Sequence, residues 1–227
     1  MDSTELTVTD ETMDGILSTL PPVQAPEIVE EAQSIFLPYL TVVQTGSKIA
    51  SPPFQEPAGS FILHHSKTDH VNLGKELDIF ICDMRHKAMH FSEKGVVSQY
   101  DPQSQEFKDI VAQADAKADG FAWGYEFLIY LGDSGKYATF FCNTVSMRMS
   151  AGRHLAPRVR QMVTLMTDFI THKSYSWWSF KTQPCEVPLA VPATQSSLVQ
   201  EIERFQQQSV EVVHEEGETT TELLEDR

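Results

Sequence analysis

The residues with the clearest chemical potential lie in one short run, Ser174–Thr182 (SYSWWSFKT), which holds two of the three tryptophans. Aromatic rings stack on nucleobases, and basic residues beside them neutralise phosphates, so such a run can bind nucleic acid. In a strand, Tyr175 and Trp177 point to one face, and Trp178 and Phe180 point to the other. Large rings then project from both faces, unless a bulge re-aims one. The alternative to exposure is that an acidic arm covers them, or that the strand is bent and buried on both sides. We expect at least one ring to be exposed.

Basic residues gather around this run. Residues 141–181 contain six basic residues but only one acidic residue, Asp168. The six are Arg148, Arg153, Arg158, Arg160, Lys173 and Lys181. The arginines fall at or before the start of a helix expected over 157–170, where positive side chains repel the helix dipole and a bound phosphate would offset that repulsion. The alternative is that they pair with carboxylates such as Asp133 or those of the acidic arms.

The net charge of −15 at pH 7 argues against nucleic acid as a partner, but the charge is unevenly distributed. Residues 1–36 hold eight acidic residues and no Lys or Arg, and residues 201–227 hold nine acidic residues and two arginines. The stretch between these arms is neutral overall. The tail from Glu211 to Arg227 is either a solvated, solubilising segment or a mimic of nucleic-acid charge that occupies the basic surface.

Other site chemistries find little support in the sequence. The histidines and nearby carboxylates show no HExxH or EF-hand spacing. They are His64, His65, His70, His86 and His90, with Asp69 and Asp83. The widely spaced Cys82, Cys142 and Cys185 include no C-x-x-C pair and read as reduced core thiols. G-x-S-x-G, P-loop and G-x-G-x-x-G motifs are also missing, so we expect no metal, no cofactor and no catalysis.

Hydrophobic periodicity predicts mainly strands in the middle of the chain. The expected strands are 61–63, 76–84 with a continuation or turn into 88–100, a hairpin of 121–131 with 137–147, and 174–182. Three helices are expected: a short one from Pro26, one over 157–170 from its apolar stripe, and one over 197–208 with Ser197 and Gln200 as a capping box. Residues 44–58 read as a loop, and residues 101–119 read as either helix or loop.

These elements suggest three segments. They are an acidic N-terminal arm with a short helix (1–36), a β-rich binding domain (37–190), and a C-terminal helix with a disordered acidic tail (191–227). The longest apolar runs fall far short of the ~20 residues that span a bilayer. The N-terminus has neither the basic nor the apolar part of a signal peptide, so we expect a cytoplasmic protein.

The order of these parts resembles that of single-stranded DNA-binding proteins of bacteriophages. A hairpin carrying Trp123 and Tyr125 is followed by a basic helix, an aromatic strand and an acidic tail. The opening Phe36–Gln44, followed by Ser47 and Lys48, also looks like the start of phage proteins of this size. The resemblance covers roughly residues 36–185 plus the tail. The tail departs from the family, because it ends in Glu225–Asp226–Arg227 rather than in an aromatic or apolar residue.

The resemblance implies an α+β fold that is mainly β, an OB-like small barrel with a basic helix between strands. It also implies non-catalytic binding of single-stranded DNA in phage replication or recombination, in the host cytoplasm. The acidic tail would then recruit replication or recombination proteins, and a homo-oligomer is compatible with this role. The rival hypothesis is a protein-interaction or virion-associated protein with no affinity for nucleic acid. A metal-dependent nuclease would need carboxylates clustered in space, which a sequence cannot show.

Overall fold

The computed structural model describes residues 37–185 except Lys67, Lys94 and Asp133, together with 195–213 and 219–223. All of these residues fall within one compact unit, Ser34–Arg227, which includes both the expected binding domain and the C-terminal segment. The helix expected from Pro26 lies outside the described residues, as does Asp133. Among the described residues, none of the helices has the length and apolar character needed to cross a membrane.

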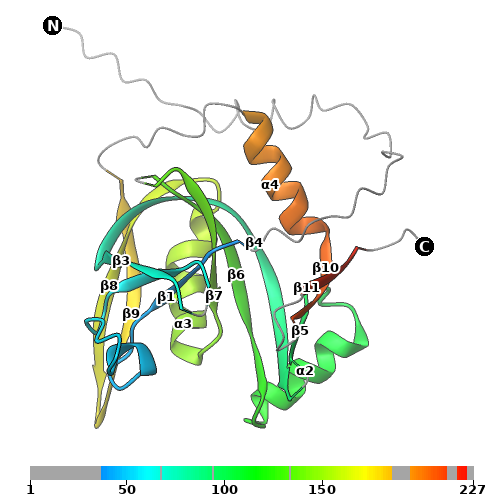
Figure 1. The fold of residues 1–227 in the computed structure, drawn as a ribbon, viewed down its shortest axis with the longest axis horizontal. Helices are drawn as coiled ribbons and strands as arrows, with labels where there is room; N and C mark the ends of the chain where they lie inside the picture. Colours follow the sequence, from blue (N-terminus) through cyan, green and yellow to red (C-terminus); the bar gives the residue numbers. More distant parts are fainter. Residues whose placement is uncertain are drawn as a thin grey trace, which may run out of the picture. The chain divides into compact units, whose positions relative to one another are not determined.

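Strands are the most abundant regular element of the described chain (Figure 1). They are β1 (Tyr39–Val42), β2 (Phe61–His64), β3 (His70–Gly74), β4 (Glu76–Ser92), β5 (Gly95–Gln99), β6 (Phe121–Leu131), β7 (Lys136–Cys142), β8 (Met162–His172), β9 (Tyr175–Pro184), β10 (Gln208–Val213) and β11 (Thr219–Leu223). The helices are α2 (Gln105–Asp115), α3 (Val145–Ser150) and α4 (Gln195–Gln207). Three short helical segments complete the set: η1 (Lys48–Ala50), the π-helical η2 (Ala151–Leu155) and η3 (Ala156–Arg158).

The described strands form one sheet in the order β11-β10-β5-β4-β6-β7-β1-β2-β3, with β8 and β9 branching from β4. The long strand β4 pairs with β6 on one side. On its other side, Glu76–Phe80 pair with β8 and Ala88–Ser92 pair with β5. The fold is therefore mainly β, as expected, and the path of the sheet is open rather than closed. Figure 1 shows β4 as a long curved strand beside β6.

Alternation along β4 separates two apolar clusters. Ile79 and Ile81 point into the main core, which the residues of β1, β2, β6–β9, α3 and η2 complete. Phe80 and Cys82 point to the opposite face, where Leu198 and Phe205 of α4 cover them. The register of β4 against β6 shifts between Ile81 and Asp83, and a bulge of this kind changes which face each later residue occupies. A third cluster lies where α2 packs on β4 and β6.

The expected hairpin of 121–131 with 137–147 is confirmed by β6 and β7, although the second strand ends at Cys142. The strands expected at 61–63, 76–84 and 174–182 are also present, as β2, β4 and β9. The helix α4 confirms the one expected over 197–208. Residues 101–119 contain a helix, α2, whose N-terminal amide at Phe107 donates to the Ser104 hydroxyl.

The helix expected over 157–170 is wrong, because residues Met162–His172 form strand β8. Its apolar residues fit both the helical period of about 3.6 residues and the strand period of two residues. Val163 and Leu165 show the strand period, and both are buried in the core. β-branched residues such as Val163, Thr164 and Ile170 favour the extended form, and pairing with β4 and β9 stabilises it. A short basic helical segment does lie between strands, but over α3, η2 and η3.

Two C-terminal expectations also need correction. Ser197 and Gln200 lie inside α4, which begins at Gln195, so they do not form a capping box at its start. The acidic tail is not disordered throughout, because β10 pairs with β5 and β11 pairs with β10. β-branched residues such as Val210 and Val212 give this segment a strand preference despite its acidic composition.

A buried cluster of three charges fastens the C-terminal segment to the sheet. Glu126 of β6 bonds Arg85 and Lys87 of β4 at 2.6 and 2.7 Å, and only 3% of its side chain is exposed. Arg85 also donates to the Phe205 carbonyl and the Gln208 side chain, and its guanidinium stacks on the Phe205 ring. Burial raises the pKa of Glu126, but the charges and hydrogen bonds of Lys87 and Arg85 outweigh it and lower the pKa.

We predict that Glu126→Gln lowers the free energy of unfolding by about 3 kcal/mol, because it removes the buried negative charge that both Arg85 and Lys87 contact. Urea denaturation should show this at neutral pH, with the exposed Glu93→Gln as a control that changes little. The folded pKa of Glu126 lies below the ordinary value of 4.5. Its stabilisation is therefore present above that value and is lost as the pH falls through the lowered pKa, so the difference between the two proteins should shrink in acid. An equal loss in Glu93→Gln would contradict the prediction.

Candidate nucleic-acid interface

The strand β9 carries the aromatic run, and it pairs with a single neighbour, β8. Its other edge is free of backbone partners over the described residues. At this edge both backbone groups of Trp178 bond one side chain: the amide of Gln44 donates to its carbonyl at 2.8 Å and accepts from its N–H at 3.0 Å. The Gln44 side chain thus makes the two hydrogen bonds that a residue of a neighbouring strand would make with Trp178. It thereby connects β9 to the segment that follows β1.

Trp178 is packed against the core and is held on three sides. Its ring lies 4.9 Å from that of Phe169, and the Lys75 ammonium lies 4.6 Å from its centroid. Behind it is Gly59, where an added Cβ would lie 2.6 Å from the indole. Phe180, on the same face of β9 by alternation, is fully within the core at 1% exposure. Both residues therefore have structural roles, although part of the Trp178 ring remains accessible.

On the opposite face of β9, the residues near the start of the strand are more exposed to solvent. Tyr175 is 73% exposed, and Trp177 is half-buried. Lys173 precedes them in the turn that joins β8 to β9, and Lys181 follows near the end of the strand. The expectation that rings project from both faces of this strand agrees with the structure. The two tryptophans differ in their surroundings, although both are partly accessible.

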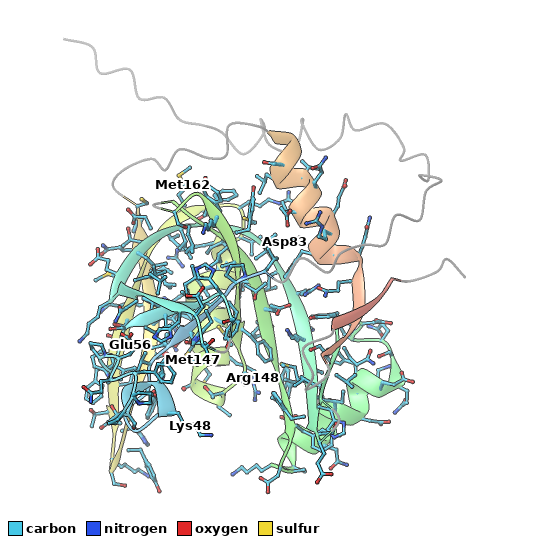
Figure 2. All side chains as sticks on the ribbon, viewed as in Figure 1. Lys48, Glu56, Asp83, Met147, Arg148 and Met162 are labelled. Carbon is cyan, nitrogen blue, oxygen red and sulfur yellow. The ribbon has the colours of Figure 1, made fainter. Side chains whose placement is uncertain are left out.

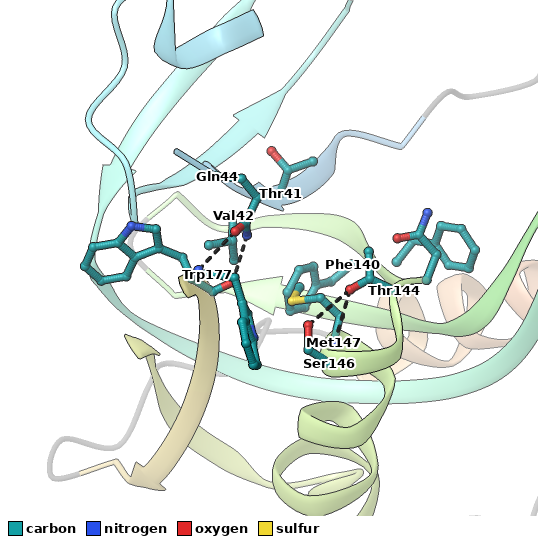
Figure 3. A pocket seen from close by; sticks show the side chains of 11 residues that line it. Thr41, Val42, Gln44, Phe140, Thr144, Ser146, Met147 and Trp177 are labelled. Carbon is teal, nitrogen blue, oxygen red and sulfur yellow. Dashed lines mark hydrogen bonds between the residues drawn. The ribbon is translucent and has the colours of Figure 1, made fainter. Parts of the chain in front are cut away.

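An open pocket of about 320 Å³ lies beside this strand. Figure 3 shows its side chains approaching from the β1 segment, from the end of β7 with α3, and from β9. The lining residues are Thr41, Val42, Gln44, Phe140, Phe141, Asn143, Thr144, Ser146, Met147, Trp177 and Trp178. The pocket arises because β1 pairs with β7 only at Tyr39 and Leu40, and the two segments diverge beyond that point.

Arg148 is occupied by structural contacts. It donates to the carbonyls of Trp123 and Asn143 at 3.0 and 2.9 Å, and its guanidinium lies 4.1 Å from the Trp123 ring centroid. The Trp123 indole in turn donates to Asp115 at 2.7 Å. Figure 2 labels Arg148 beside Met147, its neighbour on α3, which faces the core. Arg148 therefore joins α3 to β6 rather than presenting a free cation.

Three of the other predicted cations converge around His154. Burial first, and then the charges of Arg153, Arg158 and Lys181, lower the pKa of this histidine. Arg153 is exposed, and Arg158 donates to the His154 carbonyl at 3.1 Å. Lys181 pairs with Asp168 at 3.2 Å, and both side chains are about half exposed. Such a surface pair contributes little, so it costs little to exchange for another anion.

Arg160 is not among the described cations whose charges act on His154. Its side chain is exposed, its backbone has a left-handed φ of 67°, and its N–H bonds the Ile81 carbonyl. The structure therefore brings together Arg153, Arg158 and Lys181, keeps Lys173 at the far end of β9, and commits Arg148 elsewhere.

Sequence reasoning missed several residues that shape this region. They are Gln44, Gly59, Lys75, His154 and Phe169. All but Phe169 and His154 come from segments at least 100 positions away from β9 along the chain. Phe169 could have been found once β8 was taken as a strand, because it then lies across from Trp178.

The histidines and cysteines have other surroundings. His70 bonds Glu56 at 3.1 Å, and His64 stacks on Tyr39, while no three metal-ligating side chains cluster among the described residues. Burial raises the pKa of Cys82 to about 12 and that of Cys142 well above its ordinary value, so both thiols are poor nucleophiles.

The described residues thus define a mainly β protein with one open sheet, an aromatic edge strand and an adjoining pocket. Comparisons with protein-family models, with curated proteins and with solved structures gave no match.

We predict that Gly59→Ala destabilises the protein more than Gly46→Ala. Both glycines have a left-handed φ, of +84° and +81°, so both substitutions carry a similar backbone penalty of about 1 kcal/mol. Only the Gly59 substitution also meets the Trp178 ring, which should add about 1–3 kcal/mol, whereas Gly46 faces open space. Urea denaturation followed by tryptophan fluorescence measures both. Equal losses would show that Trp178 does not rest on Gly59.

Proposed function

We propose that this protein binds single-stranded DNA without catalysis. The observation that carries the proposal is the layout of β9, in which accessible aromatic rings lie between one lysine and a group of three basic residues. Tyr175 and Trp177 share one face, about 7 Å apart along the strand. Lys173 lies before them, and the group around His154 lies beyond them. Sequence-tolerant binding of single strands uses this combination of stacking rings and a basic track.

Electrostatics favours an anionic ligand at this place despite the acidic chain. The His154 group contains Arg153, Arg158 and Lys181 against the single carboxylate Asp168. Charges farther away than about 8 Å are largely screened at physiological salt, so the local excess decides what binds. A phosphate can displace Asp168 from Lys181, because both partners of that pair are solvated.

The finer parts of the proposal rest on the sequence resemblance. An OB-like binding domain is compatible with the curved open sheet, in which β8 and β9 leave the path at β4. The same resemblance supports a role in phage DNA replication or recombination, with proteins of those processes as partners of the acidic tail.

We predict that the full chain binds a labelled single-stranded oligonucleotide at low salt, and that affinity falls steeply as salt rises. Each phosphate contact contributes about 0.7 to the slope of log affinity against log salt, because bound counterions are released. Fluorescence anisotropy at several salt concentrations measures the slope. No binding at low salt, combined with self-association or capture of a protein partner, would instead support the rival hypothesis of a protein-interaction module.

We predict that Lys173→Gln weakens this binding a fewfold and reduces the salt slope by about 0.7, since it removes one phosphate contact. Lys136→Gln is a matched control, because Lys136 is an exposed lysine beside the turn of another hairpin, β6–β7. The control should bind as the unmodified protein does. If both substitutions weaken binding equally, the basic track along β9 is not the DNA site.

A further inference from the structure

Trp177, one of the residues that line the pocket beside β9, has a polar group whose hydrogen-bonding capacity is unused. The indole N–H of Trp177 is buried and has no hydrogen-bond partner among the described residues. An indole N–H can only donate, and a buried donor without an acceptor costs free energy. None of the pocket residues carries a charge. The pocket therefore favours a neutral ligand that brings a hydrogen-bond acceptor.

The walls of the pocket suit a flat ring. Trp177 and Trp178 supply aromatic surface, while Asn143 and Ser146 supply an amide and a hydroxyl. The volume of about 320 Å³ lies at the lower end of the range for small-molecule sites, ~300–1,000 Å³. A pocket of this size admits one heteroaromatic group rather than a folded segment or a duplex.

We propose that this pocket binds a single nucleobase, drawn out of the stack of its neighbours. Its ring would lie against the indoles, and a carbonyl or ring nitrogen would accept from the Trp177 N–H. The inference rests on the proposed function, because the DNA strand that follows β9 presents the base. The phosphates stay outside, near Lys173 and the His154 group, since the pocket has no cation to meet them.

Binding in this way moves a tryptophan. The Trp177 N–H is shielded from solvent in the unliganded protein, so the indole must turn about its side-chain bonds to meet the acceptor. Tryptophan emission should therefore change when a base enters the pocket, and Trp177→Phe should remove most of that change. Trp177→Phe keeps an aromatic ring but lacks the donor, so it should also weaken binding by about two- to tenfold.

The test is an abasic scan, in which oligonucleotides that each lack one base are bound to the full chain. We expect one position to lose about tenfold or more in affinity, because it supplies the pocket base, and the others to lose less. Ser146→Phe places a ring in the pocket and should abolish this position dependence. Val145→Phe adds the same ring one residue away, at a 65% exposed position outside the pocket lining, and should preserve it.

Free nucleosides separate this inference from the proposed function. Oligonucleotide binding with a uniform abasic scan, or with position dependence that survives Ser146→Phe, overturns the pocket while DNA binding stands. Binding of free thymidine, cytidine, adenosine or guanosine that Ser146→Phe blocks, without binding of any oligonucleotide, supports the pocket and overturns DNA binding. If Ser146→Phe fails to fold, the same comparison is made with Trp177→Phe. An unchanged emission response in that variant counts against the pocket.

Discussion

The pairing of β4 with β6 is the constraint on which the rest of the structure depends. β4 is long enough to hold β8 at one end and β5 at the other, so two parts of the sheet share one strand. β8 branches from the first part of β4, and the strand beyond it, β9, has no backbone partner on its far side over the described residues. That free edge is where the Gln44 side chain bonds Trp178 and where the pocket adjoins β9.

Local patterns predicted the elements that form through local pairing. The β6–β7 hairpin follows from alternation and a turn between its strands, and these are neighbours along the chain. The segment 157–170 was ambiguous because its apolar residues satisfy both the helical and the strand period. Pairing with β4, more than 80 positions earlier in the chain, stabilises the strand over the helix in this segment. Likewise, β10 becomes a strand through pairing with β5, although it falls at the start of a tail that was expected to be disordered.

The candidate site was predictable in its residue types and faces but not in its exposure. Alternation correctly separated Tyr175 and Trp177 from Trp178 and Phe180. Exposure, however, depends on Gly59, Lys75 and Gln44, and a distant residue leaves no local signal in the aromatic run. The role of Arg148 is similar. Its charge suggested a phosphate ligand, whereas its position beside Trp123 and Asn143 makes it a bridge between α3 and β6.

In the proposed mode of binding, the two tryptophans of β9 have different roles. Gln44 holds both backbone groups of Trp178, and Gly59 and Phe169 hold its ring, so its position is fixed before any ligand arrives. Fixing this residue also fixes the direction in which Trp177 leaves the strand, because successive side chains alternate. Under the proposed mode of binding, the protein would need to order only the Trp177 ring, which would reduce the entropic cost of association. The proposed base would then contact one fixed ring, that of Trp178, and one movable ring, that of Trp177, so the pocket would select for a flat ligand while accommodating rings of different size.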